Sequence, residues 1–230
     1  MNSKVSITHN DSLNIWRKHL TQILSALNLV GSKVLDVGCD SGYFSFLASE
    51  LGAKSVIGID IDESRINDAR NYARILGKTG FVEFIVSDIH DFGRSAEFDI
   101  IILSEVLEHL ENPRAALRKI NGLLQNNGFL IISVPNPDSF LSRMATFIIT
   151  KILRRYKPDT RAHKSVMPLN RLITVLKDTG FQIDTAYYYG LSLLNRLDMI
   201  DSIRSLSYIL LHRSRFQSFL GTNIFVIAKK

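Results

Sequence analysis

Acidic residues at the ends of short apolar runs could bind a nucleoside. Asp60 ends the run 55–60, and Asp88, which Ile89 follows, comes directly after the run 81–87. A carboxylate at a strand end can accept hydrogen bonds from ribose hydroxyls, and one beside an apolar residue can bind an adenine amine and cover its ring. Parallel strands carry ligands at their carboxyl ends, so these residues are predicted to share one site. The alternative is that they only cap helices and form turns.

A glycine turn precedes them. The turn and its flank hold Asp36, Gly38, Cys39, Asp40 and Gly42. Glycine lets the backbone pass close to a ligand, and a helix that begins after the turn presents free N–H groups. A dinucleotide site needs a third glycine where this chain has a tyrosine at position 43, and Asp40 would repel a pyrophosphate. A zwitterionic amino acid tolerates acidic neighbours, so we expect Asp36 and Asp40 beside its ammonium group.

A second polar set, Glu105, Glu108 and His109, follows the apolar run 98–104. If this segment is helical, Glu105 shares one face with Glu108 and with His109. An oxygen nucleophile is activated when a base removes its proton, and His109, with Glu105 beside it, is the preferred catalytic base or orienting group. The alternative is that these residues form a turn, a helix cap or the wall of a substrate pocket.

Elements of regular structure must position these residues. Hydrophobic spacing predicts helices at 11–28, 44–51, 63–76, 113–125 and 168–178. Strands are predicted at 33–37, 55–60, 81–87, 98–104, 128–134, 181–188 and 223–228. The first five strands are nearly continuous apolar runs, which are typical of buried parallel strands with helices on both faces. Crossover connections of this kind are right-handed, so the pattern predicts an α/β, doubly wound sheet.

The segments 34–44, 57–61, 98–109 and 123–135 resemble the motifs of class I S-adenosylmethionine-dependent methyltransferases. The resemblance covers residues 30–137, and more loosely 165–185 and 223–228. It implies a Rossmann-like seven-stranded sheet of order 3-2-1-4-5-7-6 with the last strand antiparallel. One departure is Asp40, which stands where the family has its middle glycine. This departure leaves open the geometry of the turn and whether cofactor affinity is reduced.

The resemblance also implies roles for single residues. Asp36, Gly38, Cys39 and Gly42 would surround the methionine part of S-adenosylmethionine. Asp60 would hold the ribose, Ile61 would pack on the adenine, and Asp88 with Ile89 would bind the adenine edge. Ser104 would offer its carbonyl to the methionyl ammonium.

Glu105, Glu108 and His109, with the distant His163, are similar to the metal site of two subfamilies. These are the ubiquinone-biosynthesis O-methyltransferases and the small-RNA 2′-O-methyltransferases. The resemblance implies that the four residues bind a divalent metal such as Mg²⁺, which would hold acceptor hydroxyls and lower their pKa.

Composition and charge limit the class of protein, its location and its partners. The chain has 230 residues, 46% of them hydrophobic and 22% charged, as expected of a globular protein, and its one cysteine excludes an internal disulfide. The N-terminus has no signal peptide, so we expect a cytoplasmic protein. Residues 1–139 carry 13 Lys/Arg and 17 Asp/Glu, whereas residues 140–230 carry 15 and 5, a net of +10. The basic part predicts an anionic partner or a merely solubilising surface.

We expect one methyltransferase domain over residues 1–230, with residues 1–30 as an N-terminal helical cap. Residues 139–166 and 189–221 are expected to be basic helical insertions that form a substrate lid. The stretch 140–156 is amphipathic, which favours either peripheral contact with an anionic membrane or an ordinary lid helix packed on the core. The many leucines and isoleucines of 191–220 favour a small-molecule or lipid-linked acceptor over nucleic acid.

The favoured function is methyl transfer from S-adenosylmethionine to an oxygen of a small apolar or lipid-linked acceptor. Two alternatives are an NAD-dependent oxidoreductase and a non-catalytic binding protein that retains the fold at an anionic membrane. The glycine spacing and Asp40 argue against the oxidoreductase.

Overall fold

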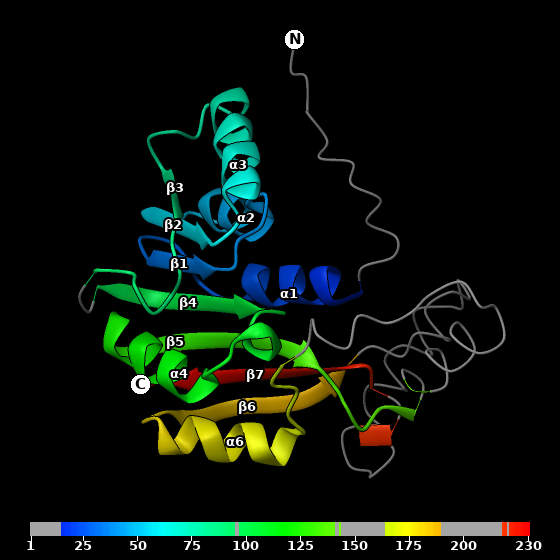
Figure 1. Ribbon diagram of the computed structural model, residues 1–230. Coiled ribbons are helices and arrows are strands. Elements are labelled where there is room, and N and C mark those ends of the chain that lie inside the picture. The colour runs from blue at the N-terminus through cyan, green and yellow to red at the C-terminus, as the bar shows by residue number, and fades with distance from the viewer. Residues whose placement is uncertain (1–14, 95–96, 141–142, 144–163, 190–217, 220) are drawn as a thin grey trace, which may run out of the picture.

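The computed structural model describes residues 15–94, 97–140, 143, 164–189, 218–219 and 221–230. These residues form a seven-stranded sheet of order β3-β2-β1-β4-β5-β7-β6, in which β7 is antiparallel to both of its neighbours (Figure 1). The strands are β1 (Lys33–Val37), β2 (Ser55–Asp60), β3 (Val82–Val86), β4 (Phe98–Ser104), β5 (Leu124–Pro135), β6 (Gln182–Tyr189) and β7 (Asn223–Lys229). The strand order and the antiparallel last strand confirm the fold expected from the sequence.

Helices cover both faces of this sheet, which explains why the inner strands are apolar on both sides. The helices are α1 (Ile15–Ala26), α2 (Tyr43–Glu50), α3 (Glu63–Ile75), α4 (Pro113–Leu123) and α6 (Leu169–Asp178). Helices α1, α2 and α3 share one buried cluster with Ile102 and Phe225 of the sheet. Helices α4 and α6 share the other cluster with Ile101 and Ile132. Neighbouring residues of one strand therefore enter opposite cores.

Local signals set the ends of several helices. Helix α3 begins where the Asp62 side chain accepts hydrogen bonds from the N–H groups of Ser64 and Arg65. Helix α4 begins after Asn112, whose side chain accepts from the N–H of Ala115. The predicted helix 113–125 is two residues too long, because Leu124 pairs with Phe98 and already belongs to β5. The strand predicted at 128–134 therefore starts four residues earlier.

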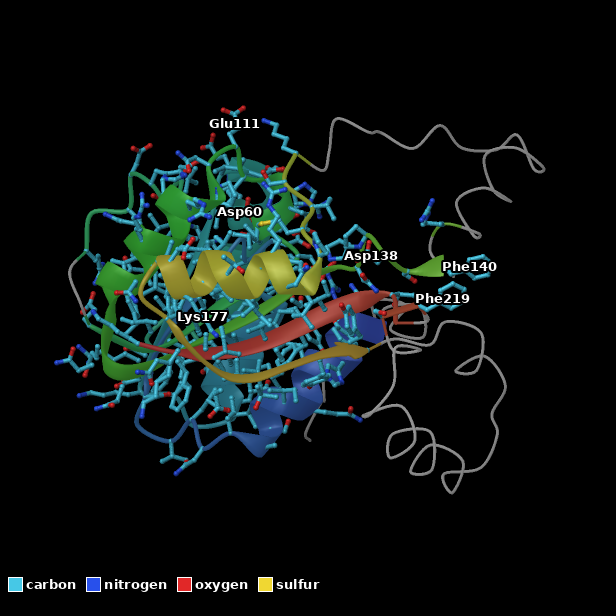
Figure 2. All side chains as sticks on the ribbon, turned by 90° about the horizontal axis from the view of Figure 1, so that it is seen from below. Asp60, Glu111, Asp138, Phe140, Lys177 and Phe219 are labelled. Carbon is cyan, nitrogen blue, oxygen red and sulfur yellow. The ribbon has the colours of Figure 1, made fainter. Side chains whose placement is uncertain are left out.

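The predicted insertions lie mostly outside the described residues, as do residues 1–14 of the predicted cap. Their flanks are described, and Phe140 and Phe219 stack with ring centroids 4.6 Å apart (Figure 2). The Asn136 amide donates to the carbonyls of Ser218 and Gly221. The chain therefore enters the first insertion and leaves the second at neighbouring points. Within the described residues, no helix is long and apolar enough to cross a membrane.

Candidate cofactor and acceptor site

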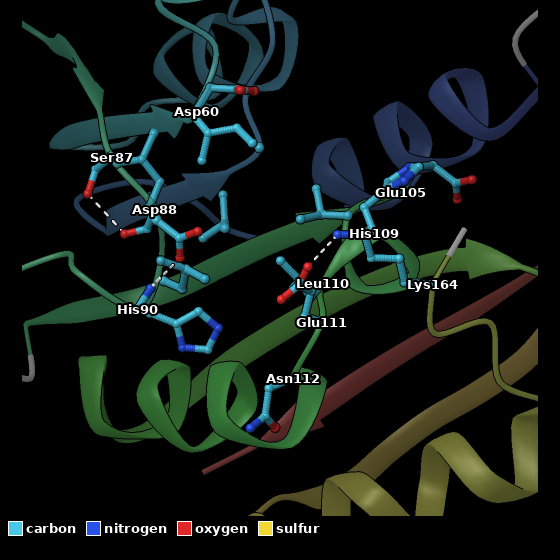
Figure 3. A pocket seen from close by; sticks show the side chains of 16 residues that line it. Asp60, Ser87, Asp88, His90, Glu105, His109, Leu110, Glu111, Asn112 and Lys164 are labelled. Atoms are coloured by element: carbon cyan, nitrogen blue, oxygen red, sulfur yellow. Dashed lines mark hydrogen bonds and ion pairs between the residues drawn. The ribbon is translucent and has the colours of Figure 1, made fainter. Parts of the chain in front are cut away.

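A cleft of about 670 Å³ opens at the carboxyl ends of β1, β2, β3 and β4 (Figure 3). It is lined by Val37, Gly38, Ile59, Asp60, Ile61, Ser87, Asp88, Ile89, His90, Glu105, Val106, His109, Leu110, Glu111, Asn112 and Lys164. This is the position at which open α/β sheets bind their ligands. The two predicted clusters, one after β2 and β3 and the other after β4, therefore lie on one cleft.

Close packing explains the glycines of the turn after β1. The backbone φ angles of Gly38 and Gly42 are +69° and +88°, which L side chains rarely adopt. A Cβ atom on Gly38 would overlap Val106, and one on Gly42 would lie 2.6 Å from the ring of Phe84. Both positions therefore need glycine for conformation and for space.

The carboxylate of Asp60 is held by the backbone on both sides. Its Oδ2 accepts from the N–H of Asp40 at 3.0 Å, and its Oδ1 accepts from the N–H of Asp62 at 2.9 Å. Each carboxylate oxygen has two lone pairs, so further acceptor capacity remains for a ligand in the cleft. A fixed carboxylate with free acceptor sites fits a pair of ribose hydroxyls.

The predicted adenine-binding residues also lie on the cleft. Asp88 accepts from the N–H of His90 at 2.8 Å, which shapes the turn after β3. The side chain of Ile89 is buried, whereas Ile61 is 73% exposed. An exposed isoleucine at the mouth of a cleft offers an apolar face to a flat ring.

The structure places other predicted cofactor residues away from the cleft lining. Asp36 is 2% exposed, accepts from Ser45 Oγ at 2.7 Å, and has its pKa raised to about 6, chiefly by burial. The Asp40 carboxylate pairs with Arg17 and Arg65 instead of facing the cleft. Both carboxylates therefore have protein partners, and their place beside an ammonium group stays a prediction. Cys39, within the turn, is buried, and Ser104 Oγ lies 2.9 Å from Ser133 Oγ.

Comparison with known proteins agrees with this geometry. A family described as a methyltransferase domain matches residues 29–180. This chain is a class I S-adenosylmethionine-dependent methyltransferase. The match includes the glycine turn, Asp60, Asp88 and the segment after β4.

Curated relatives of this methyltransferase include two named ubiquinone biosynthesis O-methyltransferase. The protein of Xanthomonas euvesicatoria is 29% identical over 167 residues, which cover 72% of this chain and 69% of the relative. That of Thiobacillus denitrificans is 23% identical over 185 residues, 80% of this chain and 79% of the relative. Among solved structures, magnesium protoporphyrin IX methyltransferase from Synechocystis, with bound S-adenosylhomocysteine, has a TM-score of 0.66 at 20% identity. That match covers 100% of this chain and 90% of the other.

The segment after β4 of the methyltransferase is not helical at Glu105, so the condition for a shared helical face is not met. Glu105 has a φ of +56°, and only Leu107–His109 forms a short 3-10 helix, η2. The left-handed backbone at Glu105 turns the chain sharply, while the Glu105 N–H still donates to the carbonyl of Ser133 at 2.9 Å. Glu105 therefore does not share a helical face with Glu108 and His109.

The side chain of Glu105 belongs to a polar cluster at the carboxyl end of the sheet. Its Oε1 accepts from Ser133 Oγ at 2.9 Å, and Asn223 Nδ2 lies 3.3 and 3.4 Å from its two oxygens. Burial raises the pKa of Glu105, and the hydrogen bonds from Ser133 and Asn223 oppose that rise. Sequence reasoning missed Ser133 and Asn223. Ser133 had a signal, since it is a hydroxyl residue inside an otherwise apolar strand.

Glu108 and His109 form a separate pair. Glu108 is 2% exposed, and its Oε1 lies 3.8 Å from Nε2 of His109, which lines the cleft and is 45% exposed. Burial, and next the nearby Glu105 carboxylate, raise the pKa of Glu108 to about 8. Burial therefore favours the protonated form of Glu108, which lies behind a histidine that reaches the cleft.

The chain that follows His163 packs on this pair. Ser165 donates its N–H to the carbonyl of Glu108 and its hydroxyl to the carbonyl of Leu110, each at 2.9 Å. Lys164 pairs with Glu111 at 2.6 Å and lines the cleft (Figure 3). No local pattern in the sequence could indicate these contacts, because they join segments more than 50 residues apart.

The predicted metal set is only partly described. His163 lies outside the described residues, and Glu105 is engaged by Ser133 and Asn223. Among the residues that the structure describes, no three His, Cys, Asp or Glu side chains are grouped to hold a metal ion.

The burial of Glu108 should appear in the pH dependence of stability. Its folded pKa of about 8 exceeds the ordinary value of 4.5, so the unfolded chain releases a proton that the folded chain retains as pH rises between these values. The Glu108 contribution to the free energy of unfolding is therefore lost with rising pH. The variant Glu108→Gln should gain stability relative to wild type from about pH 5 to about pH 8, measured by urea denaturation.

The exposed Glu50 on α2 gives a matched control, Glu50→Gln. Its stability relative to wild type should stay nearly constant over the same range. Parallel pH profiles for wild type and Glu108→Gln would contradict the burial argument.

Proposed function

We propose that this methyltransferase transfers a methyl group from S-adenosylmethionine to an oxygen of a small apolar or lipid-linked acceptor. The observation that carries the proposal is a cleft in which Asp60, fixed by two backbone N–H groups, and His109 lie on one lining. Asp60 can accept hydrogen bonds from the ribose of the adenosyl group. His109 can accept the proton that an acceptor hydroxyl must lose. The relatives named ubiquinone biosynthesis O-methyltransferase support oxygen as the target atom.

The protein groups of the cleft have distinct roles in this proposal. Bound S-adenosylmethionine supplies the activated methyl group. Asp60 holds the ribose and Ile61 covers the adenine, so that the acceptor oxygen can approach in line. Much of the acceleration comes from this positioning and from exclusion of water.

In this proposal His109 removes the proton from the acceptor. Its ring reaches the cleft, and Glu108 lies behind it at 3.8 Å. A neutral imidazole can accept the hydroxyl proton as the methyl group is transferred, and the Glu108 carboxyl limits the orientation of the ring. Glu105, which accepts hydrogen bonds from Ser133 and Asn223, shapes the part of the cleft where the acceptor would lie.

A role for divalent metal is not part of this mechanism. Glu105 is held by Ser133 and Asn223, and His163 lies outside the described residues, so the structure does not bring the four predicted ligands together. In this mechanism His109, which lines the cleft, removes the proton without a metal.

Binding of S-adenosylhomocysteine tests the cofactor site. The variant Asp60→Asn should weaken binding by about tenfold or more, because a hydrogen bond to a charged group contributes about 1.5–3 kcal/mol. Titration calorimetry measures the affinity, and NAD should give no heat. The variant Asp68→Asn, at an exposed position of α3, is the matched control and should bind like wild type. Equal affinity in Asp60→Asn and wild type would contradict the role of Asp60.

Transfer of a labelled methyl group tests the acceptor and the metal together. We expect label on the ring hydroxyl of a phenol with a long apolar tail and none on the matching amine. A chelator should leave the rate unchanged, since the mechanism needs no metal. Loss of activity that Mg²⁺ restores in wild type but not in His163→Ala would instead support the four-residue metal site.

We also propose that the protein is cytoplasmic and contacts an anionic membrane peripherally. The proposal is supported by the net charge of +10 on residues 140–230 and by the apolar acceptor. Vesicles with anionic lipid should sediment the protein at low salt, and this binding should weaken at high salt. Protein that stays in the supernatant with both neutral and anionic vesicles at low salt would contradict the proposal.

A further inference from the structure

Asp40 stands where the resemblance to the family implies a glycine, and the turn still forms. Its φ is +50°, in the left-handed region that asparagine and aspartate tolerate better than most residues. Its N–H donates to Asp60 Oδ2 at 3.0 Å. The backbone at this position therefore orients the carboxylate that is proposed to hold the ribose.

The Asp40 side chain joins two helices to the turn. Its Oδ2 lies 3.6 Å from Arg17 of α1, and its Oδ1 lies 3.1 Å from Nε of Arg65 of α3. The Arg17 side chain is only 17% exposed and also lies over the ring of Tyr43, with its Cζ 5.4 Å from the ring centroid. Tyr43 is the first residue of α2. One carboxylate thus links α1 and α3 beside the start of α2.

Helix α1 continues from this point to the acceptor side. His19, two residues after Arg17, hydrogen-bonds the Tyr187 hydroxyl at 2.7 Å and stacks on Tyr189 with centroids 4.3 Å apart. Tyr189 pairs in register with Asn223, which contacts Glu105. Figure 1 shows α1 beside the carboxyl ends of β1 and β4. The position of α1 therefore affects both halves of the site.

We propose that Asp40 is a positioning residue: its ion pairs with Arg17 and Arg65 hold α1 and α3 on the cofactor turn and thereby keep Asp60 oriented for the ribose. The inference rests on the proposed role of Asp60. A glycine at position 40 would allow the same backbone but would lack both ion pairs. Compared with glycine, aspartate at position 40 restricts the backbone of the turn but adds an electrostatic connection to α1.

Two variants and one control test this proposal. Asp40→Asn removes the charge and tolerates the same φ, whereas Asp40→Gly restores the family residue. Asp68→Asn removes one negative charge from the exposed part of α3 and is the control. Affinity for S-adenosylhomocysteine is measured by calorimetry at low and at high salt. Acrylamide quenching of Trp16, the only tryptophan of the chain and a residue of α1, reports separately on how that helix is held.

Both Asp40 variants should bind S-adenosylhomocysteine about fivefold more weakly than wild type at low salt, as expected for loss of two partly exposed ion pairs. The difference should shrink at about 1 M salt, where exposed charges are screened. Quenching of Trp16 should change in both variants and stay as in wild type in Asp68→Asn.

Affinity in either Asp40 variant that equals or exceeds that of wild type would overturn the proposal, as would Trp16 quenching that does not change. If Asp60→Asn keeps full affinity while the Asp40 variants lose it, the ribose role of Asp60 fails but the anchoring role of Asp40 stands. If wild type itself binds no S-adenosylhomocysteine, the proposed function fails, and Trp16 quenching still decides whether Asp40 anchors α1.

Discussion

The cleft depends on a close contact between the turn after β1 and the end of β2. The N–H groups of Gly38 and Cys39 both donate to the carbonyl of Ile59, at 2.8 and 3.0 Å. This double contact brings the turn beside Asp60, the next residue of β2. A Cβ on Gly58 would lie 2.7 Å from Phe84 and 2.9 Å from Cys39 Sγ, so the strand can approach the turn only as glycine. Backbone packing, more than any single side chain, creates the cofactor half of the site.

Buried polar groups shape the other half. Glu105, Ser133 and Asn223 come from the ends of β4 and β5 and the start of β7, where the antiparallel strand meets the parallel ones. Buried carboxylates are costly unless hydrogen bonds compensate them, and Glu105 has such compensation. Glu108, a few residues away, keeps a raised pKa and faces His109. Two glutamates in one short segment therefore have different environments and different proposed roles.

The insertions connect to this arrangement through their described flanks. Asn136 ties the end of β5 to Ser218 and Gly221, and Lys164 and Ser165 return the chain to the turn that carries His109. Both flanks lie at the carboxyl end of the sheet.

The amino-acid sequence by itself predicted all seven strands, with β5 four residues too short at its start, most helix limits to within one residue, and the glycine turn. Runs such as 98–104, the glycines at 38 and 42, and the cap at Asn112 are local patterns whose physical meaning does not depend on distant residues. Asp60, Asp88 and the glycine turn were predictable together because parallel strands end at one edge of a sheet.

Only the tertiary structure decided which neighbours the polar side chains meet. The sequence suggested only a ligand ammonium group near Asp40, and the fold adds arginines from α1 and α3 as its protein partners. Glu105 would share a helical face with His109 only if the segment were helical, and a left-handed backbone instead turns it toward Asn223, 118 residues away. Charges and hydrogen bonds between distant segments have no periodicity in the sequence, so they become visible only when the sheet and helix α1 bring those segments together.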